Sequence, residues 1–412
     1  MPPLNEAPRL TRQHWAILLL AWGTWLSGFF SLMLLTFLLA PVKAAFGPSE
    51  TGLAWLTGVA IGATGVGGLV FGGLADRFGR RLSIAVAIVT FVAGNLWSAW
   101  AASFTSFALA RGLAGLGIGG TWGAGQALIG ETFPAARRGR YGAIAQTGAP
   151  LGLGAAAIVG SFLAPAMGWR AGFALGALPL LLLLLLRAVP ESDVWLAHLR
   201  DRSVWRAVLA PGVRWAFVAS FVLTWLNMSN YWLTVSWLPR YLQVERGLSL
   251  AGSGTATLAF VVGCLAGYLG FGVVSDWIGR RVAFTLYCGL MALGLLMFTV
   301  LYPWIAAHPS LVLVFLAVSG IGAGTWSGYG PMMSELFPTR VRGTALSVIM
   351  NASRGVQFLA PVVIAWAAPR WGMAGGIALA AGFAVLSAAW VWTLPETRGA
   401  RIPLERVGQP AG

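Results

Sequence analysis

The chain has 412 residues, of which 58% are apolar and 9% are charged, and this composition excludes a soluble globular domain. The formal net charge of +15 would suit a nucleic-acid-binding protein, but most arginines fall in alternate gaps between long apolar runs. If each run crosses a bilayer, these gaps all lie on the same side of it. Cytoplasmic loops of membrane proteins show this asymmetry. We therefore expect a multi-pass protein of the lipid bilayer, with both termini cytoplasmic and no nucleic-acid partner.

Twelve apolar runs are long enough to cross the hydrocarbon core of a bilayer, which takes about 20 residues of helix. The first run is too long for the core of a signal peptide, and no small-residue cleavage site follows it, so it counts as a span. The expected spans are residues 15–40, 51–73, 83–103, 107–130, 142–166, 171–188, 215–242, 251–274, 283–304, 311–334, 343–367 and 374–394.

These runs predict an all-α membrane protein with twelve transmembrane helices in two six-helix bundles. The first bundle covers residues 1–188 and the second covers residues 214–394. Between them, residues 189–213 form a charged, tryptophan-containing linker, which we expect to be a cytoplasmic amphipathic helix. Residues 395–412 are expected to be a cytoplasmic tail.

The two bundles carry an internal repeat. Residues 72–81 read Gly-Gly-Leu-Ala-Asp-Arg-Phe-Gly-Arg-Arg, and residues 272–281 read Gly-Val-Val-Ser-Asp-Trp-Ile-Gly-Arg-Arg, again between two apolar runs. The sequence Glu-Thr-Phe-Pro from Glu131 recurs as Glu-Leu-Phe-Pro from Glu335, and Pro-Glu-Ser from Pro190 recurs as Pro-Glu-Thr from Pro395. Landmarks repeated in the same order predict two parallel halves related by an axis along the membrane normal.

The first copy of the loop resembles the signature loop of the major facilitator superfamily of secondary transporters, at Gly72, Leu74, Asp76, Arg77, Gly79, Arg80 and Arg81. The resemblance implies alternating access between two halves whose cytoplasmic ends are latched by Asp76, Arg80 and Glu131 and by Asp276, Arg280 and Glu335. The second copy has Trp277 in place of Arg77, so we expect its latch to be weaker. The segments at Pro190 and Pro395 resemble those of sugar porters and organic-acid/proton symporters.

The glycine runs do not predict a nucleotide site. Gly115, Gly117 and Gly120 match the dinucleotide fingerprint by spacing, but they lie inside an apolar run with no strand before them, which favours close helix packing. The glycine runs also lack the lysine of a phosphate-binding loop. We expect no cofactor, no metal site and no enzyme activity, so any uphill transport must draw on a gradient.

Arg354 lies about halfway along the expected span 343–367, and every acidic residue lies at a helix end, in a loop or in a tail. An arginine at mid-depth costs at least roughly 2.5 kcal/mol and needs a compensating partner. The counterpart of Arg354 in the first half is Pro150, so the charge is not part of the repeat. Our hypothesis is that Arg354, with Asn351 and Gln357, binds an anionic substrate such as a carboxylate. The alternative is a structural arginine bonded to helix carbonyls or water.

Other polar and aromatic residues are expected to line the same cavity. Asn227, Asn230, Tyr231 and Thr234 follow one face of the span 215–242, which should point into the bundle because a lipid-facing asparagine is costly. Bonding to a neighbouring helix is the alternative for each of them. The further candidates for the cavity are Trp122, Trp326, Trp25, Tyr329 and Gln126.

Arg111 opens the span 107–130 and resembles the superfamily's second signature, which is associated with proton coupling. A structural role and a coupling role stay open for it. The first span contains no acidic residue, and all three histidines lie outside the spans. A proton would therefore travel on the substrate's own carboxylate or on a peripheral group, or the protein would be a uniporter or an exchanger.

The function we expect is secondary transport of a small organic anion across the inner membrane of a bacterium, by a monomer and coupled to protons. The first alternative keeps the fold and changes the cargo to a sugar, a polyol or an amphipathic drug. The second alternative is a membrane receptor or scaffold that transports nothing.

Overall fold

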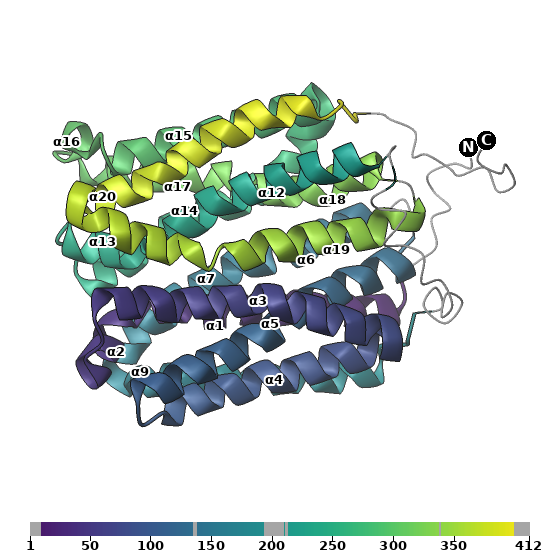
Figure 1. Ribbon diagram of the computed structural model, residues 1–412, viewed down its shortest axis with the longest axis horizontal. Helices are drawn as coiled ribbons and strands as arrows, with labels where there is room; N and C mark the ends of the chain where they lie inside the picture. The colour runs from purple at the N-terminus through teal and green to yellow at the C-terminus, as the bar shows by residue number, and fades with distance from the viewer. Residues whose placement is uncertain (1–9, 135–137, 193–209, 211–212, 338, 399–412) are drawn as a thin grey trace, which may run out of the picture.

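The computed structural model describes residues 10–134, 138–192, 210, 213–337 and 339–398, and all regular structure in these ranges is helical. Most of the expected linker helix (189–213) and most of the tail (395–412) lie outside the described residues. Figure 1 shows the helices running roughly parallel along the long axis, and the described part of the chain begins and ends at the same end of the molecule, on the right of the picture. We call this end the Arg80 end and the opposite end the Glu50 end.

The N-terminal half occupies the lower part of Figure 1. Its last span continues from α9 into a 3-10 helix (Leu175–Arg187), and a π-helical stretch (Val159–Leu163) joins α7 to α8. Its α-helices are α1 (Arg12–Phe37), α2 (Leu39–Phe46), α3 (Glu50–Phe78), α4 (Arg80–Trp100), α5 (Phe104–Thr132), α6 (Arg138–Gln146), α7 (Gly148–Ile158), α8 (Ala164–Met167) and α9 (Trp169–Ala174).

The C-terminal half lies above it and ends in a short 3-10 helix (Val391–Thr393). Its α-helices are α12 (Arg214–Val235), α13 (Leu238–Val244), α14 (Leu250–Ile278), α15 (Arg280–Phe298), α16 (Tyr302–Ile305), α17 (Pro309–Gly322), α18 (Thr325–Leu336), α19 (Thr339–Val356) and α20 (Leu359–Trp390).

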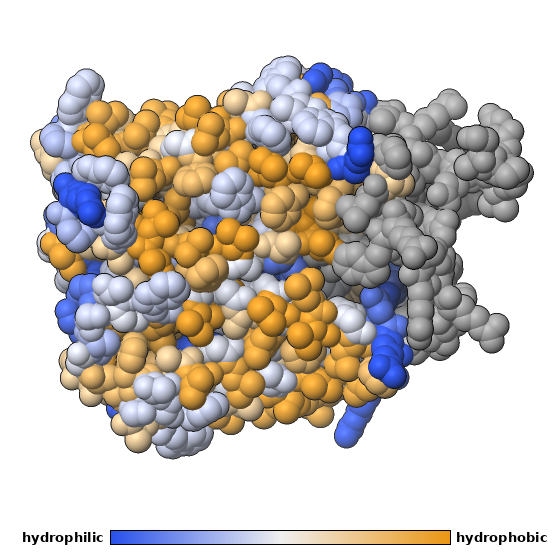
Figure 2. Space-filling view, in the orientation of Figure 1, coloured by the Kyte–Doolittle hydropathy of each residue, from blue (hydrophilic) through white to orange (hydrophobic). Residues whose placement is uncertain are grey.

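The described residues contain nine helical stretches that are long and apolar enough to cross a membrane. The last of them, residues 348–393, turns at Gly372, which has a φ of +70°, and so contains two spans. α5 and α12 also have the length of a span, with 29 and 22 residues. The helices fit the predicted twelve-span architecture, and Figure 2 shows apolar side chains between hydrophilic ones at both ends.

The internal repeat extends to the start of equivalent helices. Ser49 and Ser249 cap α3 and α14, and each side chain accepts a hydrogen bond of 3.0 Å from the backbone N–H three residues later. Gly79 and Gly279 end the same two helices with φ angles of +100° and +98°, a conformation that L side chains rarely adopt. The same local sequence therefore produces the same turn in both halves.

Small residues bring the helices close together. A Cβ at Gly115 or Gly117 of α5 would overlap Ala60 of α3 or Phe91 of α4, respectively. The predicted role of these glycines in helix packing is thus what the structure shows. Between the halves, a Cβ at Gly65 of α3 would overlap the backbone of Gly355 of α19.

Candidate functional site

Arg80 joins three elements of the N-terminal half at the Arg80 end. Its Nη1 donates to Ala75 O at the end of α3 and to Asp76 Oδ1, both at 2.8 Å. Its Nη2 donates to Glu131 Oε1 at the end of α5, at 3.1 Å. The guanidinium therefore ties the loop between α3 and α4 to the end of α5.

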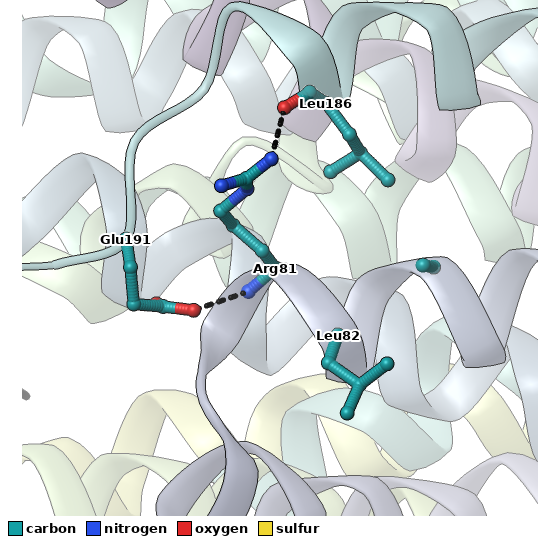
Figure 3. Close-up of a pocket in the computed structure, with 5 residues that line it drawn as sticks. Arg81, Leu82, Leu186 and Glu191 are labelled. Atoms are coloured by element: carbon teal, nitrogen blue, oxygen red, sulfur yellow. Dashed lines mark hydrogen bonds between the residues drawn. The ribbon is translucent and has the colours of Figure 1, made fainter.

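Glu191 binds the first turn of α4 beside this arginine. Its carboxylate accepts hydrogen bonds from the backbone N–H of Arg80 at 2.8 Å and of Arg81 at 3.2 Å. Figure 3 shows the Arg81 side chain turning away from that carboxylate to donate to the Leu186 carbonyl, at 2.7 Å. An anion at a helix N-terminus is stabilised by the exposed N–H groups and by the helix dipole. A cavity of about 330 Å³ lies at this corner, lined by Arg81, Leu82, Ala85, Leu186 and Glu191.

The C-terminal half repeats this network. Arg280 Nη1 donates to Ser275 Oγ at 2.6 Å and to Asp276 Oδ1 at 2.7 Å, and its Nη2 donates to Glu335 Oε1 at 3.0 Å. Glu396 takes the place of Glu191 and accepts from the backbone N–H of Arg280 at 2.9 Å. The repeated sequence landmarks therefore meet in space within each half.

The bonds of the two arginines bear on two expectations about this latch. The hydrogen bonds of Arg80 and Arg280 described above stay within their own halves, so these bonds do not themselves join the two halves. Arg280 bonds to three side chains and Arg80 to two, so the second copy does not have fewer of these bonds, and a weaker second latch stays a prediction. Arg77 forms no ion pair in the described part of the chain; its guanidinium lies 5.3 Å from the ring centroid of Phe78. Its replacement by Trp277 therefore removes no ion pair that the structure shows.

Glu396 is expected to make stability depend on pH. Partial burial opposes its charged form, but four backbone N–H donors outweigh this and hold its carboxyl pKa below the ordinary value of 4.5. The folded carboxyl thus takes up a proton less readily than the unfolded one. Its stabilisation is fully present above pH 4.5 and is lost as the pH falls through the lowered folded pKa.

We therefore expect Glu396→Gln to lower the Tm of the purified protein at neutral pH by about 2–4 °C, the size expected for a loss of roughly 1 kcal/mol. Thermal unfolding at a series of pH values checks this. The Tm difference from the wild type should narrow below pH 4.5, where the wild-type carboxyl becomes protonated too. A difference that stays constant across the series would contradict the assignment.

Arg111 lies within α5 and is completely buried. Its Nη1 donates to Asn95 Oδ1 of α4 at 2.9 Å, and its Nη2 donates to the Ser31 carbonyl of α1 at 2.9 Å. The Ser31 hydroxyl donates to the same Asn95 oxygen at 2.5 Å, and the Phe173 ring lies 5.1 Å from the guanidinium carbon. These contacts all belong to the N-terminal half, so they favour the structural alternative for Arg111.

Replacing Arg111 with alanine is expected to lower the Tm by about 5 °C or more, because it removes these bonds and leaves a cavity at the junction of three helices. Substrate affinity should change by less than about threefold, since the contacts of Arg111 described above all lie within the N-terminal half. Thermal unfolding and equilibrium binding on the same sample check both parts. An unchanged Tm with a lost proton stoichiometry would instead favour the coupling role.

Arg354 lies on α19 between the two halves, and 1% of the residue is exposed. Its guanidinium carbon lies 5.0 Å from the ring centroid of Trp25 on α1 and 5.5 Å from that of Trp122 on α5. A side chain of the C-terminal half therefore contacts two rings of the N-terminal half. Among the described residues, Arg354 Nη1 and Nη2 have no hydrogen-bond partner. The faces of the two rings attract the positive charge of the guanidinium, but they do not provide the oxygen acceptors that its N–H groups need.

The neighbours of Arg354 are themselves positioned by hydrogen bonds. Trp122 Nε1 donates to Gln146 Oε1 of α6 at 2.8 Å, which fixes the plane of the ring. Asn351 lies one turn before Arg354 at the contact with α3, where a Cβ at Gly68 would overlap its side-chain amide. The structure thus brings Arg354, Trp25 and Trp122 into direct contact, with Asn351 beside them.

Two candidates are engaged in helix contacts. Gln357 Nε2 donates to Ser229 Oγ of α12 at 3.2 Å and to the Ser353 carbonyl at 3.1 Å. Asn227 Oδ1 accepts from Thr325 Oγ1 of α18 at 3.0 Å. For Asn227 the structure favours the alternative of bonding to a neighbouring helix, and the Gln357 amide also bonds to a neighbouring helix.

The remaining candidates lie in three places. Tyr231 and Trp326 contact each other, with ring centroids 5.1 Å apart, and Asn230 precedes Tyr231 on α12. Tyr329 lies one turn after Trp326, with its ring 5.7 Å from that of Phe284. Gln126 lies at the contact between α5 and α6, where its Oε1 would be 3.4 Å from a Cβ at Gly142.

The sequence analysis missed the aromatic pair that joins the halves. Phe29 of α1 stacks on Trp232 of α12 with ring centroids 6.0 Å apart, and it also lies 4.8 Å from Trp25 and 6.5 Å from Tyr231. The position of Trp232 next to the polar stripe was the only signal. Phe29 thus connects the Arg354 site to the aromatic side chains of α12.

An ion pair that joins the halves at the Glu50 end was also missed. Glu50 Oε1, at the start of α3, accepts from Arg240 Nη2 of α13 at 2.5 Å and from Lys43 Nζ at 2.6 Å. A cavity of about 290 Å³ lies along this boundary, lined by Glu50, Trp237, Arg240, Val244, Ile364, Ala365, Ala368, Pro369 and Met373. The partners are 190 residues apart in the chain, so no local sequence pattern pairs them.

The sequence model of the Major Facilitator Superfamily matches residues 20–307 and 247–411. A putative metabolite transport protein of Haemophilus influenzae is 30% identical over 386 residues, covering 90% of this chain and 93% of that protein. A probable 4-methylmuconolactone transporter of Cupriavidus pinatubonensis is 28% identical and covers 98% and 94%. The cis,cis-muconate transport protein of Acinetobacter baylyi is 27% identical and covers 94% of each chain.

Solved structures agree on the fold. The crystal structure of a D-xylose-proton symporter superposes with a TM-score of 0.75 at 23% identity, covering 94% of this chain and 99% of that one. This likeness concerns the fold alone. The sequence match covers nearly the whole chain. The repeated loop network and the two helical bundles agree with it. The chain therefore belongs to the Major Facilitator Superfamily, as a multi-pass membrane transporter and not an enzyme.

Proposed function

We propose that this transporter carries a small organic carboxylate and that Arg354 binds the carboxylate group. The observation behind this proposal is that Arg354 is 1% exposed, while both of its terminal nitrogens have no hydrogen-bond partner among the described residues. A buried donor without an acceptor costs about 1–3 kcal/mol, and more when it is charged. An oxyanion that accepts both N–H groups side by side would remove this cost.

The place of Arg354 supports a role in transport rather than in folding. Arg111 has the same chemistry, but both of its terminal nitrogens donate inside one half, to Asn95 and Ser31. Arg354 belongs to one half and contacts Trp25 and Trp122 of the other. Binding sites of transporters built from repeats lie at the repeat interface, near the middle of the membrane. A ligand on Arg354 would therefore contact both halves during alternating access.

The names of the relatives support the same substrate class. Proteins matched over most of this chain are named as transporters of cis,cis-muconate, sialic acid and benzoate. A neutral sugar would leave the buried charge of Arg354 without a counter-ion, whereas a carboxylate supplies one. We therefore prefer the carboxylate to the sugar or the drug.

We further propose proton-coupled symport by a monomer in the inner membrane of a bacterium, with the Arg80 end cytoplasmic. The arginines at the Arg80 end support this orientation, and the relatives named above are bacterial. Carboxylate uptake by sealed vesicles should acidify their lumen. Uptake without a pH change would leave uniport or exchange as the mechanism.

The substrate class is tested by thermal stabilisation of the purified protein with carboxylates, neutral sugars and amphipathic cations, followed by flux in proteoliposomes. We expect stabilisation and saturable flux with a subset of carboxylates, because a ligand that binds only the folded state raises the Tm. A response to sugars or cations alone would contradict the proposal. No flux with any compound would favour a receptor or scaffold.

A further inference from the structure

A second group of buried side chains, beside the Arg354 site, lacks hydrogen-bond acceptors. Asn230 Nδ2 of α12 and Trp326 Nε1 of α18 have no partner among the described residues, and neither residue is more than 3% exposed. We call these two residues the donor cluster. Folded proteins leave few buried donors unpaired, because each costs about 1–3 kcal/mol. Two such donors together point to a ligand that supplies an acceptor.

The contacts between α12 and α18 place the members of the donor cluster near one another. Trp326 packs on Tyr231, which follows Asn230 in the chain, with ring centroids 5.1 Å apart. Asn227, one turn before Asn230 on the same helix face, bonds to Thr325, the neighbour of Trp326, at 3.0 Å. The two donors thus come from the point where these two helices meet.

A continuous series of aromatic contacts links the donor cluster to Arg354. From Trp326 the series runs through Tyr231, whose ring centroid lies 5.1 Å from that of Trp326 and 6.5 Å from that of Phe29. Phe29 lies 4.8 Å from Trp25, and the Trp25 ring lies 5.0 Å from the Arg354 guanidinium carbon. A flat or extended molecule held along these rings would have one end at Arg354 and the other at the donor cluster.

The two ends differ in charge. Arg354 is cationic, whereas the donor cluster consists of one amide and one indole N–H group and contains no ionisable side chain. A second carboxylate buried among neutral donors would lack a counter-ion, at a cost of several kcal/mol. A neutral carbonyl oxygen accepts the same hydrogen bonds without that cost.

We propose that the donor cluster binds a neutral carbonyl oxygen at the end of the substrate opposite its carboxylate: the oxygen of a ketone, an ester, an amide or an un-ionised carboxyl group. This inference rests on the proposed function, because it takes Arg354 as the site of the carboxylate. The transporter would then select acids with two oxygen-bearing ends over plain acids of the same size.

The test compares acids that differ in one carbonyl oxygen. Equilibrium binding to the purified full-length protein is measured for 4-oxocyclohexanecarboxylate against cyclohexanecarboxylate, and for 4-oxopentanoate against pentanoate. We expect the keto acid of at least one pair to bind about tenfold more tightly, as two neutral hydrogen bonds would provide. In Trp326→Phe and in Asn230→Leu the advantage should fall to about threefold or less, while the Kd of the plain acid stays within about twofold.

Trp304→Phe is the matched control for the loss of an indole N–H, because Trp304 is 80% exposed and lies at the Glu50 end. It should keep the full keto-acid advantage. A dicarboxylic acid gives a further check, since only its monoanion carries a neutral carboxyl group. Its affinity should rise as the pH is lowered toward its second pKa.

The outcomes separate this inference from the proposed function. If plain acids bind but neither keto acid has an advantage, or if the advantage survives both substitutions, the donor cluster is not the second site and the carboxylate proposal stands. A dicarboxylic acid that binds most tightly as its dianion would overturn the neutral-acceptor assignment. If no acid of any pair binds, the proposed function fails, and the second site fails with it.

Discussion

Arg354→Gln is expected to reduce carboxylate uptake at least about 100-fold, with a Tm close to that of the wild type. The substitution removes two hydrogen bonds to a charged donor, each worth about 1.5–3 kcal/mol, and 1.4 kcal/mol corresponds to a factor of ten. Stability should hold because the guanidinium makes no hydrogen bond through its terminal nitrogens in the described part of the protein. Initial uptake rates in proteoliposomes over a range of substrate concentrations check this prediction.

Two further variants sharpen the result. Arg354→Lys keeps the charge but loses the planar fork, so it should fall between glutamine and the wild type. Arg370→Gln is the control, because Arg370 is exposed and bonds only to the Trp366 carbonyl in the described residues. Its uptake should equal that of the wild type. If Arg354→Gln transports carboxylates normally, Arg354 does not bind the substrate.

Gly65→Ala is expected to lower uptake about tenfold or more without unfolding the protein. The added Cβ would overlap the backbone of Gly355 in α19, and a backbone contact cannot be relieved by a change of rotamer. The two halves would have to move apart along the boundary between α3 and α19. Since alternating access requires this boundary to close once per cycle, the cycle should slow.

A cysteine at Ala365 reports on that boundary, because Ala365 lines the cavity beside the ion pair of Glu50 and Arg240. In a Gly65→Ala background it should react faster with a maleimide, while the native cysteines, both buried, react slowly. Gly123→Ala is the matched control, since a Cβ at Gly123 meets nothing within 4 Å. Equal uptake and equal labelling in the two glycine variants would show that this contact does not limit transport.

The fold could be predicted because its sequence signals occur in both halves of the chain. Apolar runs of the length of a bilayer give the helices, and the serine caps and positive-φ glycines recur at an offset of 200 residues, at Ser49 and Ser249 and at Gly79 and Gly279. Irregular features were not predictable in the same way. The π-helical stretch at residues 159–163 and the turn at Gly372 depend on packing between helices.

The site was only partly predictable. The sequence shows no embedded acid near Arg354, and for this reason Arg354 could be named as a candidate. The structure places it against two tryptophans of the other half. The sequence could not decide whether an amide bonds to a helix or points into a cavity, because both choices need the same inward-facing position. Asn227 and Gln357 turned out to bond to helices. The partners of Arg111 could not be predicted either, because Ser31 and Asn95 lie on two other helices.

The most direct test of the account compares a substrate acid with its primary amide, which has nearly the same shape but no charge. Equilibrium dissociation constants are measured for both ligands with wild-type protein and with Arg354→Gln. The account predicts that the acid binds the wild type at least about 100-fold more tightly than the amide, and that this preference disappears in the variant. A preference for the acid that is equally large in both proteins would contradict it, because the negative charge would then be recognised elsewhere.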